Sequence, residues 1–242
     1  MKLLPLLAVT FAVLPGLAAA EDLARLFPAL TRIDLRNEGV TVLYPRERGE
    51  PATPPAWLKE YEEAGVYASA PLTLRLGTLP ALTLVCDSGP SADPSCRLLR
   101  DPAKPEEDVF QAAGTQFAFL PDARIVVAGH SNNFYDQRKV YLWKDGRFGE
   151  VPQPLRHVGL AGMLKQAVTL RRAPGAGAAG IGVTLAAGSR VTVLLNDNSH
   201  VDDAGQNPDY LLLTADGIVG WAHLPGQPDG STAVEGLFFK GD

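Results

Sequence analysis

The sequence predicts a mainly β protein, in which a β-rich N-terminal domain with one or two short helices precedes a second, smaller β unit. Short segments rich in β-branched and aromatic residues recur along the chain between clusters of turn residues, as in proteins built from many strands. Residues 144–147 contain an Asp-Gly pair, which accepts the positive φ angles of a tight hairpin turn. Only residues 21–30 and 55–67 have the composition of helices.

The expected strands lie on both sides of this hairpin turn and before it. They cover residues 40–44, 72–76, 81–86, 96–100, 115–120, 124–128 and 139–143. Pro152 and Pro154 end the hairpin, and a connector should follow them. We therefore expect a β-rich domain over 21–155, a linker over 156–166 and a small β domain over 167–242.

Residues 1–20 have the pattern of a cleavable signal peptide. A basic start and an apolar run precede the small residues of a cleavage site at 18–20. Pro15 and Gly16 interrupt the apolar run before it reaches the ~20 residues that a membrane-spanning helix needs. We therefore expect export to the periplasm, the cell envelope or the extracellular space, with no membrane span after cleavage.

Composition and charge narrow the classes of partner. Apolar residues make up 46% of the chain, which permits a real core and argues against wholesale disorder. The net charge is −5, from 22 basic and 27 acidic residues spread along the chain. No basic stripe is present that could displace counterions from a phosphate backbone. The sequence therefore predicts no nucleic-acid partner.

The two cysteines of the chain predict a disulfide. Cys86 and Cys96 bracket a segment rich in Gly, Pro, Ser and Asp, which has the composition of a loop between strands. In an oxidising exported compartment such a pair is typical of a structural disulfide that closes a short loop. No His or further Cys lies nearby in a recognised metal or catalytic spacing.

A set of residues after residue 168 falls in an ordered pattern. An Arg stands three residues before a Pro, a Leu and a Gly precede a Val-x-Val strand, and a Gly-Trp pair comes near the end. These residues are Arg171, Pro174, Leu185, Gly188, Val191, Val193, Gly217, Gly220 and Trp221. The order resembles the bacterial SH3-like (SH3b) domain family. The resemblance implies a small SH3-like barrel that binds cell-wall peptide or glycan, or an envelope protein.

The chain also departs from this family pattern. Tyr210 stands where the family usually has Trp, and the loop before it, 196–209, is longer than usual. Residues 141–160 are similar to uncharacterised exported bacterial proteins that place a β-rich region before an SH3-like domain. That similarity names no activity, so the resemblance implies a fold and an expectation of binding.

Residues 175–180 match the GxGxxG pattern of dinucleotide-binding proteins, but their context rejects that interpretation. The short stretch that follows contains Gly182 and Gly188 and is a poor helix former. Arg171 and Arg172 precede the glycines, where a buried parallel strand should be continuously apolar. A flexible hairpin loop explains the glycines, and we predict no cofactor.

The polar loop 129–138 is a candidate ligand site. His130, Asn132 and Asp136 could contact a small ligand between two strands. The loop begins like a nucleophile elbow, but Asn133 stands where that motif requires Gly. A hydrogen-bonded turn is the alternative, because Asn and Asp cap turns for local backbone reasons.

The polar stretch 196–203 suggests calcium by composition only. It lacks the alternating acid spacing and the closing Glu of a calcium loop, so a solvated loop is the alternative. The four histidines, His130, His157, His200 and His223, show no i, i+4 pairing and no local Cys partner. We therefore predict no metal site.

Aromatic residues are the remaining clue to function. Tyr210 and Trp221 should lie on adjacent strands of the SH3-like unit, where aromatic faces can stack on sugar rings or clamp a peptide. A core position for the tryptophan is the alternative. We expect a non-enzymatic exported binding protein whose SH3-like domain contacts cell-envelope polymer or a protein partner. The alternatives are a hydrolase of envelope polymer with a catalytic N-terminal domain, and a structural or assembly factor.

Overall fold

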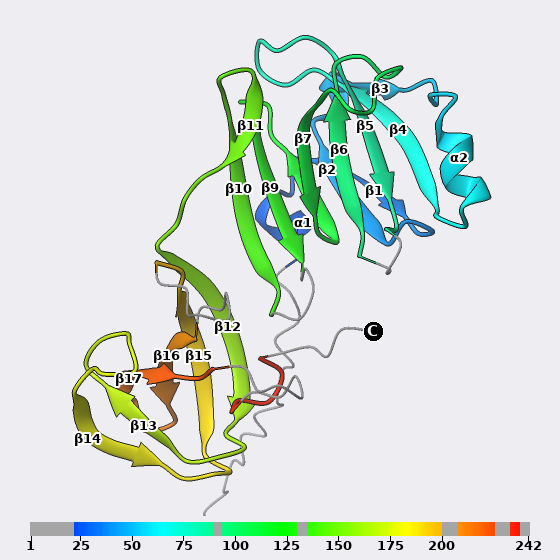
Figure 1. The fold of residues 1–242 in the computed structure, drawn as a ribbon. Coiled ribbons are helices and arrows are strands. Elements are labelled where there is room, and N and C mark those ends of the chain that lie inside the picture. The colour runs from blue at the N-terminus through cyan, green and yellow to red at the C-terminus, as the bar shows by residue number, and fades with distance from the viewer. Residues whose placement is uncertain (1–21, 90–92, 130–134, 200–207, 226–232, 238–242) are drawn as a thin grey trace, which may run out of the picture.

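The computed structural model describes residues 22–89, 93–129, 135–199, 208–225 and 233–237, which form two β lobes (Figure 1). The predicted signal peptide at 1–20 lies outside the described residues. Strands β1 to β11 and both helices build the first lobe, and β12 to β17 build the second. The expectation of a mainly β protein with a β-rich N-terminal domain and short helices is confirmed.

The first lobe consists of two packed sheets. One sheet contains, in spatial order, β1 (Thr31–Leu35), β2 (Val40–Tyr44), β8 (Gln116–Phe119), β9 (Arg124–Gly129), β10 (Gln137–Lys144) and β11 (Arg147–Glu150). The other contains β3 (Gly49–Pro51), β4 (Ala68–Leu74), β5 (Leu82–Asp87), β6 (Ser95–Leu99) and β7 (Asp108–Ala113). β2 and β8 pair in parallel, because the chain leaves after β2, builds the whole second sheet and then returns beside β2.

The hairpin predicted at residues 144–147 joins β10 to β11. Lys144 pairs with Arg147, and the two turn residues between them have positive φ angles, 51° at Asp145 and 86° at Gly146. This is the tight turn for which the Asp-Gly pair is suited.

Apolar side chains of both sheets fill the space between them. Phe110 of β7 lies edge-on to four aromatic rings of the other sheet: Phe117, Phe119, Tyr141 and Phe148. Aromatic pairs in this geometry stabilise a core beyond the area that they bury. Burial raises the pKa of Tyr141 to about 12.

A short helix covers part of each outer face of the sandwich. α1 (Leu23–Leu26) places Leu23 among buried residues of the β2, β8 and β9 sheet, and its backbone N–H donates to Oε1 of Gln116 at 2.8 Å. α2 (Leu58–Glu63) places Leu58 against Val85 and Leu99 of the other sheet. Among the described residues, no helix is long and apolar enough to cross a membrane.

The predicted disulfide is present. Cys86 and Cys96 lie directly opposite one another on β5 and β6, and both are fully buried in the core between the sheets. The link therefore joins two neighbouring strands at the point where their register places both side chains on the core face.

The second lobe is a six-stranded antiparallel sheet. Its strands are, in spatial order, β12 (Leu155–Met163), β15 (Arg190–Asp197), β16 (Asp209–Thr214), β17 (Val219–His223), β13 (Val168–Arg171) and β14 (Gly180–Leu185). The described strands do not close into a ring, so the small SH3-like barrel is not confirmed and stays a prediction. Gly220 packs closely enough against Leu170 that a Cβ would lie 2.9 Å from the Leu170 Cβ.

The stretch expected as a linker, 156–166, is mostly strand. β12 pairs with β15 from Leu155 opposite Asp197 to Met163 opposite Arg190, with an irregularity between His157 and Leu160. The two prolines before β12 end the hairpin as expected, but the chain enters the second sheet at once. A unit that begins at residue 167 therefore omits one of its six strands.

Tyr135 attaches the first lobe to the second. It precedes β10, yet its side chain is 3% exposed and packs in the core of the second lobe. Its hydroxyl donates to Oδ1 of Asn196 at 3.2 Å, and its ring lies edge-on to that of Tyr210 with centroids 6.4 Å apart. Arg156 of β12 adds hydrogen bonds to Gln137 and Glu150. A residue that precedes β10 of the first lobe therefore forms part of the core of the second lobe.

We expect loss of the disulfide to destabilise the first lobe. In a Cys86→Ala/Cys96→Ala variant the free energy of unfolding should fall by about 2 to 3 kcal/mol, because the unfolded chain is no longer constrained by the link. Denaturant unfolding followed by tryptophan fluorescence measures the difference. Reduced wild-type protein is the matched control and should lose a similar amount; an unchanged midpoint in both would contradict the structural role.

We expect the second lobe to need β12. A fragment of residues 153–242 should fold, whereas a fragment of residues 167–242 should not, because the latter lacks the partner of β15 and the buried Leu164. Even the longer fragment should unfold at a lower temperature than the same lobe in the intact chain, because Tyr135 is missing. Circular dichroism melts test both statements, and equal melts of the two fragments would show that β12 is dispensable.

We expect stability to fall as the pH rises above 10. Burial raises the pKa values of Tyr135, Tyr141 and Tyr210 above the ordinary 10, so these groups stay protonated in the folded chain while they ionise in the unfolded chain. Their contribution is complete below pH 10 and is lost as the pH approaches their folded values. The denaturant midpoint measured against pH should show this, and Tyr135→Phe should flatten the decline. An identical decline in the variant would contradict the assignment.

Candidate functional site

The described end of the predicted polar loop, residues 135–138, lies at the junction of the lobes. His130 and Asn132 lie outside the described residues. Asp136 is half-buried and directly follows Tyr135, the residue that inserts into the second lobe. The described part of this loop therefore attaches the lobes to one another.

Tyr210 and Trp221 lie on neighbouring strands but on opposite faces of the second sheet. Tyr210 of β16 lies opposite Ala222, and Trp221 of β17 lies opposite Leu211. Tyr210 and Ala222 are buried in the lobe core, and burial raises the pKa of Tyr210. Trp221 is only half-buried, so it alone of the two can offer its ring to a ligand.

The described part of the calcium-like stretch forms a local turn. Oδ1 of Asp197 accepts hydrogen bonds from the backbone N–H and the hydroxyl of Ser199, at 2.9 Å and 2.5 Å. This is the side-chain turn that Asp makes for local backbone reasons. The acidic residues Asp202 and Asp203 lie outside the described residues, and no group of His, Cys, Asp or Glu within the described part could hold a metal ion.

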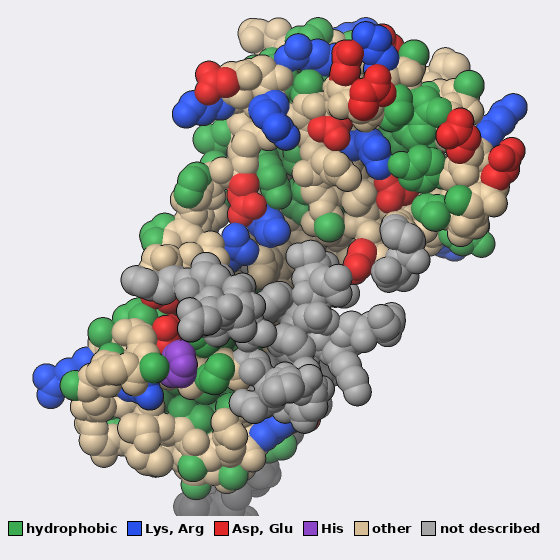
Figure 2. Space-filling model, in the orientation of Figure 1, with side chains coloured by type: hydrophobic (Ala, Val, Ile, Leu, Met, Phe, Trp, Pro, Cys, Tyr) green, Lys and Arg blue, Asp and Glu red, His purple; other side chains and the backbone are tan. Residues whose placement is uncertain are grey.

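A pocket lies on the outer face of the β3–β7 sheet, beside α2. Its volume is about 460 Å³. Side chains of the sheet form its floor, and residues of α2 and of the segment after it form one wall. Figure 2 shows hydrophobic side chains over this part of the first lobe, with acidic side chains around them. None of the lining residues was predicted as a site from the sequence.

The floor follows from the alternation of side chains along β5, β6 and β7. Because Cys86 and Cys96 face the core, their neighbours Asp87, Ser95 and Arg97 face outward. Gln111 of β7 lies opposite Arg97 and extends the floor by one strand. The disulfide therefore lies on the opposite side of the same strands from the pocket.

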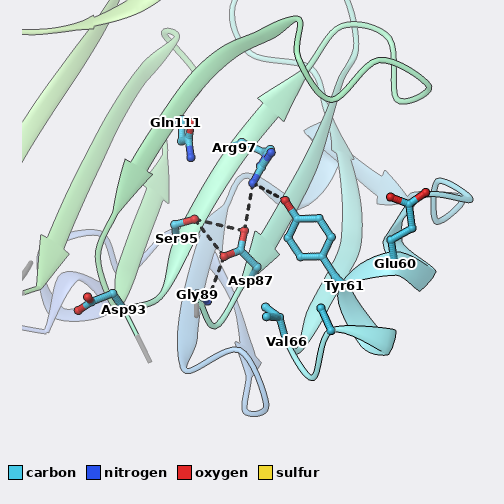
Figure 3. Close-up of a pocket in the computed structure, with 10 residues that line it drawn as sticks. Glu60, Tyr61, Val66, Asp87, Gly89, Asp93, Ser95, Arg97 and Gln111 are labelled. Atoms are coloured by element: carbon cyan, nitrogen blue, oxygen red, sulfur yellow. Dashed lines mark hydrogen bonds and ion pairs between the residues drawn. The ribbon is translucent and has the colours of Figure 1, made fainter. Parts of the chain in front are cut away.

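Asp87 is the centre of a hydrogen-bond network in the floor (Figure 3). Its Oδ1 accepts from the backbone N–H of Gly89 at 3.1 Å, and its Oδ2 accepts from the Ser95 hydroxyl at 3.2 Å. Nη2 of Arg97 lies 3.4 Å from Oδ2 of Asp87. The two side chains are only 7% and 14% exposed, so the pair is held away from bulk water.

Arg97 connects this floor to the wall. Its Nη2 also donates to the hydroxyl of Tyr61 at 3.1 Å, and Figure 3 shows the ring of Tyr61 reaching from α2 with its hydroxyl edge toward the guanidinium. Trp57 packs against the Tyr61 ring with centroids 5.6 Å apart. Ala64 and Val66 complete an apolar wall. The helix thus presents an aromatic ring to the pocket in a defined position.

The guanidinium of Arg97 retains donors that the protein does not use. The hydrogen bonds to Asp87 and Tyr61 both come from Nη2, while Nε is buried and has no partner among the described residues. A buried donor without a partner is costly, so Nε is an unsatisfied part of this network, and Nη1 is the end of the guanidinium that a ligand could contact.

The charges of the pocket are unbalanced. Glu60 and Asp93 add two carboxylates to that of Asp87, whereas Arg97 is the one basic residue among the described residues of the lining. Neither Glu60 nor Asp93 forms an ion pair within the described part of the chain. The pocket therefore has a negative potential once Asp87 and Arg97 neutralise one another.

The polar groups in the floor of the pocket are engaged with one another. Ser95 donates its hydroxyl hydrogen bond to Asp87, which is itself paired with Arg97, so Ser95 has no free base beside it. The described residues that line the pocket include no histidine. What the pocket provides is an aromatic wall, unused donors and a fixed polar floor.

The sequence contains a signal for this floor. The polar residues Asp87, Ser95 and Arg97 alternate with residues of the core on two segments that the disulfide brings together. Alternation of this kind places polar groups on one face of a sheet, but only the position of α2 turns that face into a pocket.

Comparisons with protein-family models, with curated proteins and with solved structures find no match for this chain.

Proposed function

We propose that this chain is a non-enzymatic, exported binding protein of the cell envelope, and that it holds one unit of an envelope polymer in the pocket beside α2. The observation that supports this most is the floor of the pocket, where the buried Asp87–Arg97 pair holds a guanidinium with unused donors beside the ring of Tyr61. The volume of about 460 Å³ lies within the range of small-ligand sites, roughly 300 to 1,000 Å³.

Export is part of this proposal. It is supported by the signal-peptide pattern of residues 1–20 and by the buried Cys86–Cys96 disulfide, a bond that persists in oxidising compartments. A mature chain that starts at Glu21 in the periplasm, the envelope or the medium is the expected product.

The C-terminal lobe offers a second contact surface, as the SH3-like resemblance implies. Trp221 lies half-exposed between Leu211 and Arg171 on the face away from the lobe core. An aromatic residue in this position can supply an additional contact to a polymer that extends beyond the pocket.

A hydrolase of envelope polymer is the alternative that uses the same pocket. Asp87 would then have to act as acid or base, although its oxygens are occupied by Gly89, Ser95 and Arg97. The binding assignment therefore predicts that the protein leaves the polymer intact. Release of soluble fragments by the wild type, abolished in Asp87→Asn, would overturn it.

We expect Tyr61→Ala to weaken retention of the mature full-length protein on purified envelope polymer by about 1 to 3 kcal/mol, because the aromatic wall is lost. Co-sedimentation over a range of polymer concentrations measures the change. Trp221→Ala, which removes the aromatic residue of the second contact surface, is the comparison variant, and it should lose less.

The two variants separate the possible outcomes. Circular dichroism must first show that both are folded. Loss of retention in Trp221→Ala with normal retention in Tyr61→Ala would move the contact to the second lobe and overturn the pocket assignment. Normal retention in both variants, or no retention of the wild type, would overturn the proposed function.

A further inference from the structure

The donors of Arg97 define the first requirement for a ligand. Nη2 is used by Asp87 and Tyr61, and Nε, which has no partner among the described residues, is fully buried and out of reach of a ligand. The hydrogens of Nη1 have no protein acceptor among the described residues, and they remain for a ligand. The Tyr61 hydroxyl accepts from Arg97 and keeps its own hydrogen for another acceptor. A ligand for this floor must therefore bring acceptor oxygens.

The charges of the pocket define the second requirement. An acceptor oxygen that carries a full negative charge would enter a pocket whose described lining already holds the carboxylates of Glu60, Asp87 and Asp93. The guanidinium of Arg97 is already paired with Asp87. Like charges gathered in one concave site repel one another. The acceptor oxygens must therefore be uncharged, as in a hydroxyl or an amide carbonyl.

The wall defines the third requirement. Tyr61 presents a ring to the pocket, and Ala64 and Val66 add apolar side chains to the lining, which suits a ligand with an apolar face. The floor is the face of β5 and β6, whose backbone groups already pair with neighbouring strands, so a peptide could not add itself as a further strand there. A compact ring with an apolar face and hydroxyl groups at its rim meets all three requirements.

We infer that the pocket takes a sugar ring without an anionic substituent, with the ring face on Tyr61 and a hydroxyl or acetamido oxygen on the guanidinium of Arg97. This inference rests on the proposed function, because it names the class of polymer unit that the same pocket holds. The carboxylates of Glu60 and Asp93 act as a filter that rejects acidic sugars.

Calorimetric titration of the mature full-length protein tests the ligand class. The probes are a neutral oligomer of N-acetylglucosamine, an anionic oligogalacturonate and a basic oligolysine. The neutral oligomer should bind with little dependence on salt, because no net charge is neutralised. The affinity for the anionic oligomer should be lower by about tenfold or more. Tighter binding of the anionic oligomer, or binding of oligolysine alone, would overturn the inference.

Two sets of variants test the residues. Arg97→Lys keeps the charge beside Asp87 but loses the planar fork of donors, so affinity for the neutral oligomer should fall about tenfold. Arg75→Lys is its matched control, since Arg75 pairs with Glu50 outside the pocket and should not alter binding.

In Glu60→Gln/Asp93→Asn the anionic oligomer should bind more tightly, while the affinity for the neutral oligomer should be unchanged. If the double variant still binds the anionic oligomer as weakly as the wild type does, Glu60 and Asp93 do not exclude acidic sugars.

Failure of this inference can be told from failure of the proposed function. If envelope polymer is still retained through Tyr61 while the neutral sugar does not bind, only the ligand class is wrong. If retention does not depend on Tyr61 at all, the pocket is not the binding site, and both the proposed function and the ligand class are wrong.

Discussion

The pairing of β5 with β6 is the interaction on which both the core and the candidate site depend. Cys86 and Cys96 lie opposite one another and face the core, where the disulfide holds the register of the two strands. Because successive side chains face opposite sides, the same register turns Asp87 and Arg97 outward. A slip of one residue would bury this charged pair in the apolar core, so one covalent link maintains the two faces together.

The floor of the pocket shows how a buried ion pair can serve orientation. Removing Asp87 and Arg97 from water costs more than their attraction returns unless further hydrogen bonds satisfy them. Gly89 and Ser95 satisfy the carboxylate, and Tyr61 accepts from the guanidinium, but part of the guanidinium is left unsatisfied. A group held this rigidly and left incomplete is suited to a ligand that completes it, which is why the proposed function centres on Arg97.

The two lobes are joined by packed side chains as well as by the chain that connects them. Tyr135 belongs to the chain between β9 and β10, yet it is buried in the core of the second lobe beside Tyr210. β12 enters the second sheet directly after the last hairpin of the first lobe. The pocket beside α2 and the half-exposed Trp221 are therefore carried by one connected framework, which suits contacts with an extended polymer.

The sequence by itself determined the features that depend on neighbouring residues. Strand-like segments, the Asp145–Gly146 turn and the Cys86–Cys96 link follow from local composition and spacing, and the structure contains all of them. None of the pocket residues was predicted, because Tyr61 and Arg97 meet only after α2 folds over the sheet. The strand in the expected linker and the insertion of Tyr135 were likewise decided by tertiary structure. Each depends on which distant surfaces pack together, and periodicity along the chain carries no information about that choice.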